Sequence, residues 1–542
     1  MRRAWAAGRA VLAAVVAAAA SPALTRAQAV RPYRPEVDVL DYAFALTLPD
    51  TGGAIEGEAT VRFTRTAPTD TLVLDLVEPR VLGVRVDDRE VSFGRDSATV
   101  RIPLPPHAPG DTLVAAVRYA GTPADGLIIS RDGAGRWMAF GDNWPDRARH
   151  WLPVVDHPSD KATVSWAVNA PRGRTVVANG VLLDATDVGD SRRVTRWRES
   201  RPIAPYLMVI AAAPLVRVDL GATACGLGQA RGCVPQAVYV MPDARRFAPG
   251  AFRDAGEIVR WYATVVAPFP YEKLAHLQSS TRFGGMENAT AIFYANGTFR
   301  HGTPGRSLIA HETAHQWFGD AVTEREWAHL WLSEGFATYF AALVTRHEDG
   351  DSAFRAEMRR IRDEVVASPV SAERPVIDTA ETQYLKLLNT NSYQKGAWTL
   401  HMLRGTLGDS AFFRGVRAYY LAHRDGTALS DDLRAALEAS SGRQLGWFFD
   451  QWLRRPGFPE LVTRWRYDAA ARRVRLTVAQ GARFAPYRFP LDVEVVDASG
   501  RPHRTTVDVP AARETTFELD TPLAAPPRAI RLDPDVKLLA KF

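Results

Sequence analysis

The period of the hydrophobic residues changes twice along the chain, and this change constrains the fold more than any other feature of the sequence. From about residue 33 to residue 240, segments such as Ala59–Arg65 and Thr163–Val168 alternate apolar and polar residues, as half-buried strands do. From about residue 243, apolar residues recur at helical spacing. Alternation returns after Pro459. The sequence therefore predicts strands, then helices, then strands again.

We accordingly expect a multidomain α+β protein. The expected parts are a signal peptide at residues 1–29, an N-terminal all-β domain at 30–242, a mainly helical domain at 243–457 and a small β-sandwich at 458–542. Within the all-β domain, Asn179-Gly180 lies between apolar segments and predicts a hairpin turn. The helical domain is expected to contain a short β element ahead of residue 304.

The first 29 residues have the composition of a secretory signal peptide. Arg2 and Arg3 precede an apolar run over residues 10–20, and Ala27-Gln28-Ala29 offers a cleavage site of the small-x-small type. A membrane anchor is the alternative, but the run is shorter than the ~20 residues that span a bilayer. We expect export to the periplasm or the extracellular space, and no further membrane span.

Removal of the signal peptide would leave the chain almost neutral. The whole sequence has a formal net charge of +6, and residues 1–29 carry four arginines and no acid, which leaves 6 − 4 = +2. So small a charge gives no electrostatic reason to expect nucleic acid as a partner. Cys225 and Cys233 are expected to form a disulfide in an exported protein, with two free thiols as the alternative.

Residues 311–334 contain the pattern of a metal site. His311 and His315 are four residues apart, so on a helix they share one face and can bind a single ion. Glu312 lies about 100° round that helix, where it can act on a ligand of the ion without binding the ion itself. Glu334 follows His315 after eighteen residues, at the start of a second helical run. Two imidazoles and one carboxylate leave one tetrahedral position for water, as catalytic zinc requires, whereas solvated histidines are the alternative.

Other motifs surround this pattern. They are Ala148–Pro153, Asp156–Pro158, Gly284–Asn288, Trp331–Ala337 and Tyr393–Ala397. Together with the histidine spacing, these motifs resemble the aminopeptidase N family of zinc metallopeptidases, which includes leukotriene hydrolase. The resemblance covers about residues 35 to 460, and it implies a thermolysin-like fold for the helical domain.

The resemblance implies a role for each motif residue. One zinc ion per chain would be bound by His311, His315 and Glu334, with Glu312 as the general base. Tyr393 would donate a hydrogen bond to the oxyanion of the tetrahedral intermediate.

The resemblance also implies how a peptide is bound. Glu287 would bind the substrate's free ammonium group. Gly284 and Gly285 would let an extended peptide approach as an added strand. Met286 is a possible part of the pocket for the first side chain.

The sequence departs from the family pattern at two positions. Asp142 stands where relatives often place Gln or Glu to assist ammonium binding, and it is expected to bind substrate in their place. Ala341 stands where relatives commonly carry a Glu that supports the zinc ligands. Asp320 and Glu324 are nearby acids that could substitute for that Glu, but we expect both on a solvated face.

The leading functional hypothesis is a zinc aminopeptidase that acts on peptides. A zinc endopeptidase with the same helix motif is one alternative, and an inactive peptide-binding scaffold is another. A scaffold needs none of the five residues that carry the chemistry, which are His311, Glu312, His315, Glu334 and Tyr393. Their joint presence favours an enzyme.

Overall fold

The computed structural model describes residues 34–106, 108–223, 234–300, 304–521 and 523–542. The expected signal peptide and both cysteines lie outside these residues. The chain divides by its contacts into two compact units, and each is described by itself. The first comprises residues 1–224, 230–256 and 271–306, and the second comprises residues 225–229, 257–270 and 307–542. No helix of the described ranges is both long and apolar enough to cross a membrane.

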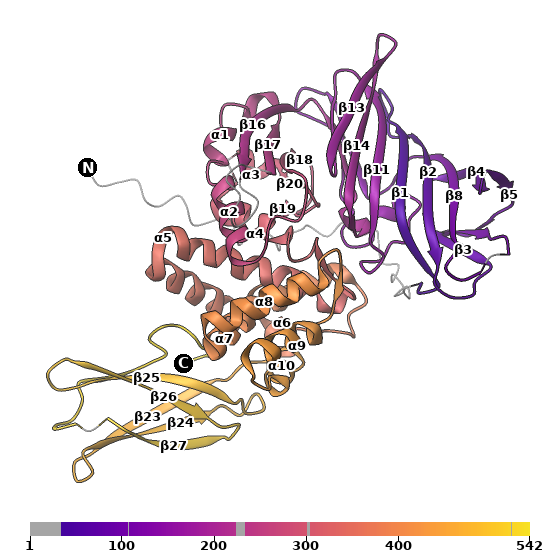
Figure 1. Cartoon of the computed structure of the whole chain (residues 1–542). Coiled ribbons are helices and arrows are strands. Elements are labelled where there is room, and N and C mark those ends of the chain that lie inside the picture. Colours follow the sequence, from indigo (N-terminus) through magenta and orange to yellow (C-terminus); the bar gives the residue numbers. More distant parts are fainter. Residues whose placement is uncertain (1–33, 107, 224–233, 301–303, 522) are drawn as a thin grey trace. The chain divides into compact units, whose positions relative to one another are not determined.

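An eight-stranded sheet forms most of the first unit (Figure 1). Its strands run in the order β13 (Val181–Val188), β14 (Arg192–Ile203), β11 (Ala162–Pro171), β1 (Val37–Thr47), β2 (Ile55–Arg65), β8 (Thr112–Gly121), β4 (Arg80–Val86) and β5 (Arg89–Val91). Only the pairing of β1 with β11 is parallel among these described strands. Buried side chains alternate with exposed or partly exposed ones along β2, β8 and β11, which confirms the strands predicted from alternation.

Two smaller sheets complete the N-terminal β region. One runs β3 (Thr71–Asp75), β7 (Thr99–Pro103), β6 (Gly94–Arg95), and the other runs β12 (Thr175–Ala178), β15 (Ile210–Ala213), β10 (Trp137–Gly141), β9 (Leu127–Arg131). The predicted hairpin at Asn179-Gly180 is wrong, because β12 pairs with β15 whereas β13 pairs with β14 in the other sheet. This turn passes the chain from one sheet to the other, and the Asn179 side chain holds it by hydrogen bonds to the Leu207 carbonyl and the Val209 amide.

A five-stranded sheet ends the first unit. Its order is β16 (Val216–Thr223), β17 (Val234–Val240), β18 (Leu274–Ser279), β20 (Ala291–Ala295), β19 (Gly285–Met286). The short helices α1 (Ala248–Ala251) and α3 (Asn296–Arg300) accompany it. This sheet is larger than the short β element that the sequence predicts. The alternation pattern missed β18, because all six of its residues are buried and a strand buried on both faces shows no alternation. The sheet also takes strands from both sides of residue 242, and the expected domain boundary there stays a prediction.

Helices predominate in the second unit as far as Leu453. They are α2 (Ala255–Val265), α4 (Arg306–His315), α5 (Trp331–Ala367), α6 (Pro369–Glu373), α7 (Gly396–Leu407), α8 (Asp409–His423), α9 (Ser430–Ser441) and α10 (Gly446–Leu453), with one parallel strand pair, β21 (Val322–Glu324) and β22 (Gly426–Ala428). The chain reverses between α4 and α5, and Phe318 packs on Phe336 there with ring centroids 4.2 Å apart. The Trp317 indole donates to the Ala267 carbonyl at 2.9 Å. The ring contact holds the end of α4 against the start of α5, and the indole hydrogen bond ties the same end to the segment after α2.

Two three-stranded sheets follow the helices, as the returning alternation predicts (Figure 1). One runs β23 (Leu461–Asp468), β24 (Arg473–Gln480), β27 (Glu514–Leu519), and the other runs β26 (Pro502–Val509), β25 (Phe489–Val496), β28 (Ala529–Leu532). His401 on α7 hydrogen-bonds the Val536 carbonyl at 2.7 Å, which joins the helices to the C-terminal segment.

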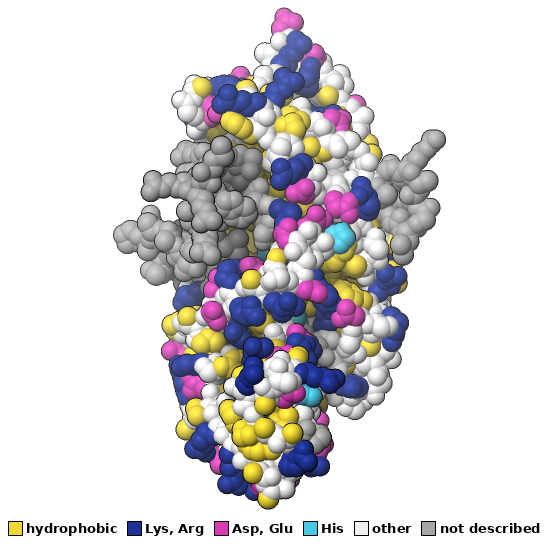
Figure 2. Space-filling view, turned by 90° about the vertical axis from the view of Figure 1, so that its left-hand side faces the viewer, with side chains coloured by type: hydrophobic (Ala, Val, Ile, Leu, Met, Phe, Trp, Pro, Cys, Tyr) yellow, Lys and Arg dark blue, Asp and Glu magenta, His cyan; other side chains and the backbone are white. Residues whose placement is uncertain are grey.

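Charged side chains of both signs are mixed on the surface. Figure 2 shows Lys and Arg side chains next to Asp and Glu side chains over the face that it displays. This mixture agrees with the near-neutral charge expected of residues 30–542.

Candidate metal centre

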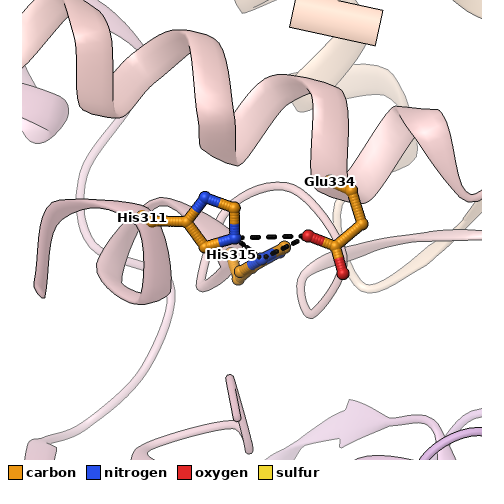
Figure 3. A group of neighbouring side chains, drawn as sticks. All are labelled: His311, His315 and Glu334. Atoms are coloured by element: carbon orange, nitrogen blue, oxygen red, sulfur yellow. Dashed lines mark hydrogen bonds and ion pairs between the residues drawn. The ribbon is translucent and has the colours of Figure 1, made fainter. Parts of the chain in front are cut away.

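The helix α4 carries His311, Glu312 and His315, and the first turn of α5 carries Glu334. Figure 3 shows the two imidazoles and the carboxylate pointing toward one another. His311 Nε2 lies 3.1 Å from His315 Nε2, and Glu334 Oε2 lies 3.2 Å from the first nitrogen and 3.4 Å from the second. Glu312 and His315 are 4% and 1% exposed. The predicted ligands therefore converge in a buried place.

The converging atoms fit a zinc ion. Zinc binds imidazole nitrogen and carboxylate oxygen at ~2.0–2.2 Å, and tetrahedral ligands at that distance are about 3.4 Å apart. The three separations in this chain lie close to that value. Two imidazoles and one carboxylate also match the ligand types of catalytic zinc sites.

The protonation states suit metal binding. Burial lowers the pKa of His311, even though Glu334 acts to raise it, so the imidazole is neutral at neutral pH. Burial acts to raise the pKa of Glu334, but the adjacent His315 and His311 outweigh it and lower the pKa to about 2, so the carboxylate is ionised. A neutral imidazole and an ionised carboxylate are the forms that bind a metal ion.

A second set of contacts orients His315. Its Nδ1 lies 3.1 Å from the Phe318 carbonyl and 2.9 Å from Ser333 Oγ. Because Nδ1 donates to the carbonyl, the proton is held on that nitrogen and the lone pair of Nε2 faces the metal site. Ser333 directly precedes the ligand Glu334, yet its role was not predicted from the sequence. A hydroxyl beside a ligand was the available signal.

Tyr393 lies in a short π-helical turn, η7 (Asn391–Lys395). Its hydroxyl donates to Glu334 Oε1 at 2.7 Å, and its ring stacks on that of His311 with centroids 5.9 Å apart. Single π turns inside helices occur frequently at functional sites. The structure thus brings the predicted tyrosine to the predicted metal ligands, although its catalytic role is a separate matter.

Two glycines explain how close these elements come. A Cβ on Gly335 would lie 2.9 Å from the carbonyl carbon of Gly396, and a Cβ on Gly396 would lie 3.0 Å from the Cα of Gly335. The backbones of α5 and α7 therefore touch at this point. Gly335 follows the ligand Glu334, and Gly396 follows the turn that carries Tyr393, so this contact sets the distance between the two side chains.

The expectation for Asp320 and Glu324 is wrong. Both side chains are buried, at 0% and 1% exposure, and Gln316 donates to Asp320 at 2.8 Å. The chain bends sharply after α4, because Gly319 has a φ of +119°, and this bend places both acids inside. Ala341, the other departure from the pattern, is buried at 5% exposure.

The remaining predicted residues belong to the first unit. Gly285 and Met286 form β19, the edge strand of the five-stranded sheet, with Gly284 before it and Glu287 after it. Met286 and Glu287 are 2% and 6% exposed. Asp142 follows β10 and is fully buried. The parts these residues play in peptide binding stay predictions.

Comparison with known proteins agrees with the fold and with a zinc cofactor. The Peptidase family M1 domain matches residues 251–452, and the Peptidase M1 N-terminal domain matches residues 40–207. The chain belongs to peptidase family M1, the aminopeptidase N family. Membership indicates a zinc cofactor, and His311, His315 and Glu334 are a group that could hold the ion.

Relatives and solved structures of family M1 extend over most of this chain. It is 27% identical to aminopeptidase N of Streptomyces lividans over 86% of its own length and 57% of the relative, and 26% identical to probable aminopeptidase 2 of Sulfurisphaera tokodaii over 64% and 45%. The chain thus spans about half the length of these curated relatives. The crystal structure of an M1 zinc metallopeptidase from Deinococcus radiodurans is similar with a TM-score of 0.67 and 26% identity, over 78% of this chain and 95% of that one.

Proposed function

We propose that this chain is a zinc-dependent aminopeptidase that releases N-terminal residues from peptides. The observation that carries the proposal is the convergence of His311, His315 and Glu334, with the Tyr393 hydroxyl on the same carboxylate. A structural zinc site would be closed by four protein ligands, whereas three ligands leave room for chemistry. Membership in family M1 supports the same reading.

The protein residues supply the proton transfers and the oxyanion contact. Bound zinc supplies Lewis acidity, which polarises the scissile carbonyl and acidifies water. Glu312 accepts the proton of the attacking water and passes it to the leaving amine. Tyr393 donates a hydrogen bond to the developing oxyanion. Its hydroxyl donates to Glu334 Oε1, which places this donor beside the metal centre.

Exopeptidase action depends on recognition of a free N-terminus. A buried carboxylate recovers its desolvation cost when it meets an ammonium group, and Glu287 offers such a carboxylate. β19 is the edge strand of its sheet, where an extended peptide could be added as a further strand, and Gly284 presents no side chain in the way. These features favour an aminopeptidase over an endopeptidase.

The test compares leucine p-nitroanilide with its N-acetylated form. We expect kcat/KM to be at least about 100-fold lower for the blocked substrate, since it lacks the charge that Glu287 binds. Glu312→Gln should lower kcat by about 100- to 10,000-fold, because it removes the general base. Glu373→Gln, at the exposed end of α6, is the matched control and should match the wild type.

Other outcomes select the alternatives. Internal cleavage of N-terminally blocked peptides at the same rate would make the protein an endopeptidase. Absence of hydrolysis with zinc bound would make it a binding scaffold.

We also propose that the protein is exported. The support is the order of segments in residues 1–29, where basic residues are followed by an apolar run and then by a cleavage site of small residues. N-terminal sequencing of the protein recovered from its native host should begin at Val30. A chain that retains Met1 would refute cleavage.

A further inference from the structure

Asp142 belongs to a closed set of four charges in the first unit. Arg147 Nη1 lies 2.7 Å from Asp125 and its Nη2 lies 3.2 Å from Asp142 Oδ1. Arg282 Nη2 lies 2.8 Å from Asp125 and its Nε lies 3.5 Å from Asp142 Oδ2. Each carboxylate therefore faces both guanidinium groups. We name these four residues the charge ring.

The charge ring leaves Asp142 without spare negative charge. Two aspartates and two arginines sum to zero, and each oxygen of Asp142 already faces a cation. Burial acts to raise the pKa of Asp125, but Arg147 and Arg282 outweigh it and lower that pKa. Asp142 is 0% exposed. An ammonium group would have to displace an arginine to reach it.

The same carboxylate holds the backbone of the segment that leads to Glu287. Thr281 Oγ1 donates to Asp142 Oδ1 at 3.3 Å, and the Arg282 amide donates to Asp142 Oδ2 at 3.4 Å. The next residue, Phe283, lies under the Arg147 guanidinium at 5.9 Å and packs edge-on against Trp144 with centroids 6.1 Å apart. The ring thus grips residues 281–283, immediately before β19.

Asp142 is itself firmly placed by the backbone around it. Its amide donates to the Gly126 carbonyl at 2.6 Å, and Gly126 has a φ of +74°. A Cβ at Gly126 would lie 2.1 Å from the Arg147 carbonyl, so only glycine fits there. The loop before β9 and the end of β10 therefore hold Asp142 in place beside residues 281–283.

We infer that Asp142 does not bind the substrate ammonium and instead positions the segment 281–287, with Arg282 as its partner. Of the two candidates, Glu287 alone then supplies the carboxylate that binds the substrate's ammonium group. This inference rests on the proposed aminopeptidase function for its kinetic consequence, whereas the positioning itself is a property of the fold.

A double-mutant cycle tests the inference. Asp142→Asn and Arg282→Gln should each lower kcat/KM for leucine p-nitroanilide by about 10- to 100-fold, and the double variant should be no worse than the poorer single one, because both break one unit. Arg136→Gln is the matched control, since Arg136 is exposed to a similar degree and pairs with Asp132 at 2.6 Å outside the ring. This control should match the wild type.

Hydrogen exchange gives a readout that does not need activity. Amides of residues 281–287 should exchange about tenfold faster or more in both single variants, and at the wild-type rate in the control. Two kinetic results would show that Asp142 binds substrate and that the inference is wrong. One is a lower kcat/KM in Asp142→Asn while Arg282→Gln matches the wild type, and the other is multiplication of the two effects in the double variant. Unchanged hydrogen exchange in the variants would also overturn the inference. An inactive wild type, combined with faster exchange in the variants, would overturn only the proposed function.

Discussion

Glu334 makes two kinds of contact at once, and this pairing defines the centre at the scale of single residues. One carboxylate oxygen faces the two histidines and the other accepts from Tyr393. The helical spacing of His311 and His315, together with Glu334 at the start of a second helical run, predicted the first contact. The second could not be predicted by spacing, because Tyr393 reaches Glu334 through a π turn 59 residues away.

Removing the Tyr393 hydroxyl tests its catalytic part. Tyr393→Phe keeps the ring that stacks on His311, so the fold and the zinc content should be unchanged. The loss of one oxyanion donor should lower kcat by about 100- to 1,000-fold with little change in KM. Steady-state kinetics beside a zinc determination measure both, and a kcat within threefold of the wild type would exclude the oxyanion role.

Ser333 should affect metal affinity rather than the chemical step. Ser333→Ala removes one of the two groups that fix His315 Nδ1, while the Phe318 carbonyl remains. Zinc affinity should fall by about tenfold, at the low end for loss of such a contact. Competition with a fluorescent zinc chelator measures this, with Ser352→Ala on the exposed face of α5 as the control. Equal affinities in all three proteins would show that the serine does not orient the ligand.

At the scale of elements, period and packing contribute differently. Alternation predicted β2, β11 and β24 because one face of each is more exposed than the other. It did not predict β18, because both faces of that strand are buried. Helical spacing identified α7, but it did not show that α7 touches α5 at paired glycines. That contact depends on how two helices cross, which a single sequence does not encode locally.

The glycine contact predicts a selective effect of added methyl groups. Gly396→Ala puts a Cβ 3.0 Å from Gly335, so α5 and α7 must separate, at a cost of about 1–3 kcal/mol, and Tyr393 moves away from Glu334. Activity should fall about tenfold or more, together with Tm. Gly405→Ala on the same helix meets its nearest atoms at 3.9 Å and should be neutral or slightly stabilising. Equal Tm and activity in the two variants would contradict the contact.

At the scale of the whole molecule, the chain combines two units, one of sheets and one of helices with C-terminal sheets. The three expected folded regions all exist, although the two compact units do not follow their boundaries. The order of strands within each sheet lay beyond the sequence, because it depends on pairings between distant segments such as β1 with β11. Stability is also a property at this scale, and buried acids make it depend on pH.

Asp160 should lower the stability of the first unit as the pH rises. It is buried beside Val39 and Tyr42, and burial raises the pKa of its carboxyl to about 8, from 3.8. Between pH ~4 and ~8 the folded state keeps a proton that the unfolded state releases, so the free energy of unfolding falls by about 1.4 kcal/mol per pH unit from this group. Below that window, the group has no such effect.

Asp160→Asn removes this titration. The variant's stability relative to the wild type should therefore increase steadily from pH 5 to pH 8, as measured by urea unfolding, while Asp50→Asn, at an exposed surface site, shows no trend. A constant difference between variant and wild type across this range would mean that Asp160 is ionised in the folded protein.

The central claim is that one zinc ion on His311, His315 and Glu334 is required for peptide hydrolysis. The most direct measurement follows zinc content and leucine p-nitroanilide hydrolysis together while a chelator removes the metal and zinc is then restored. We predict one zinc per chain in the active protein, loss of activity in proportion to zinc removed, and recovery on its return. Full activity in protein stripped of zinc would contradict the claim.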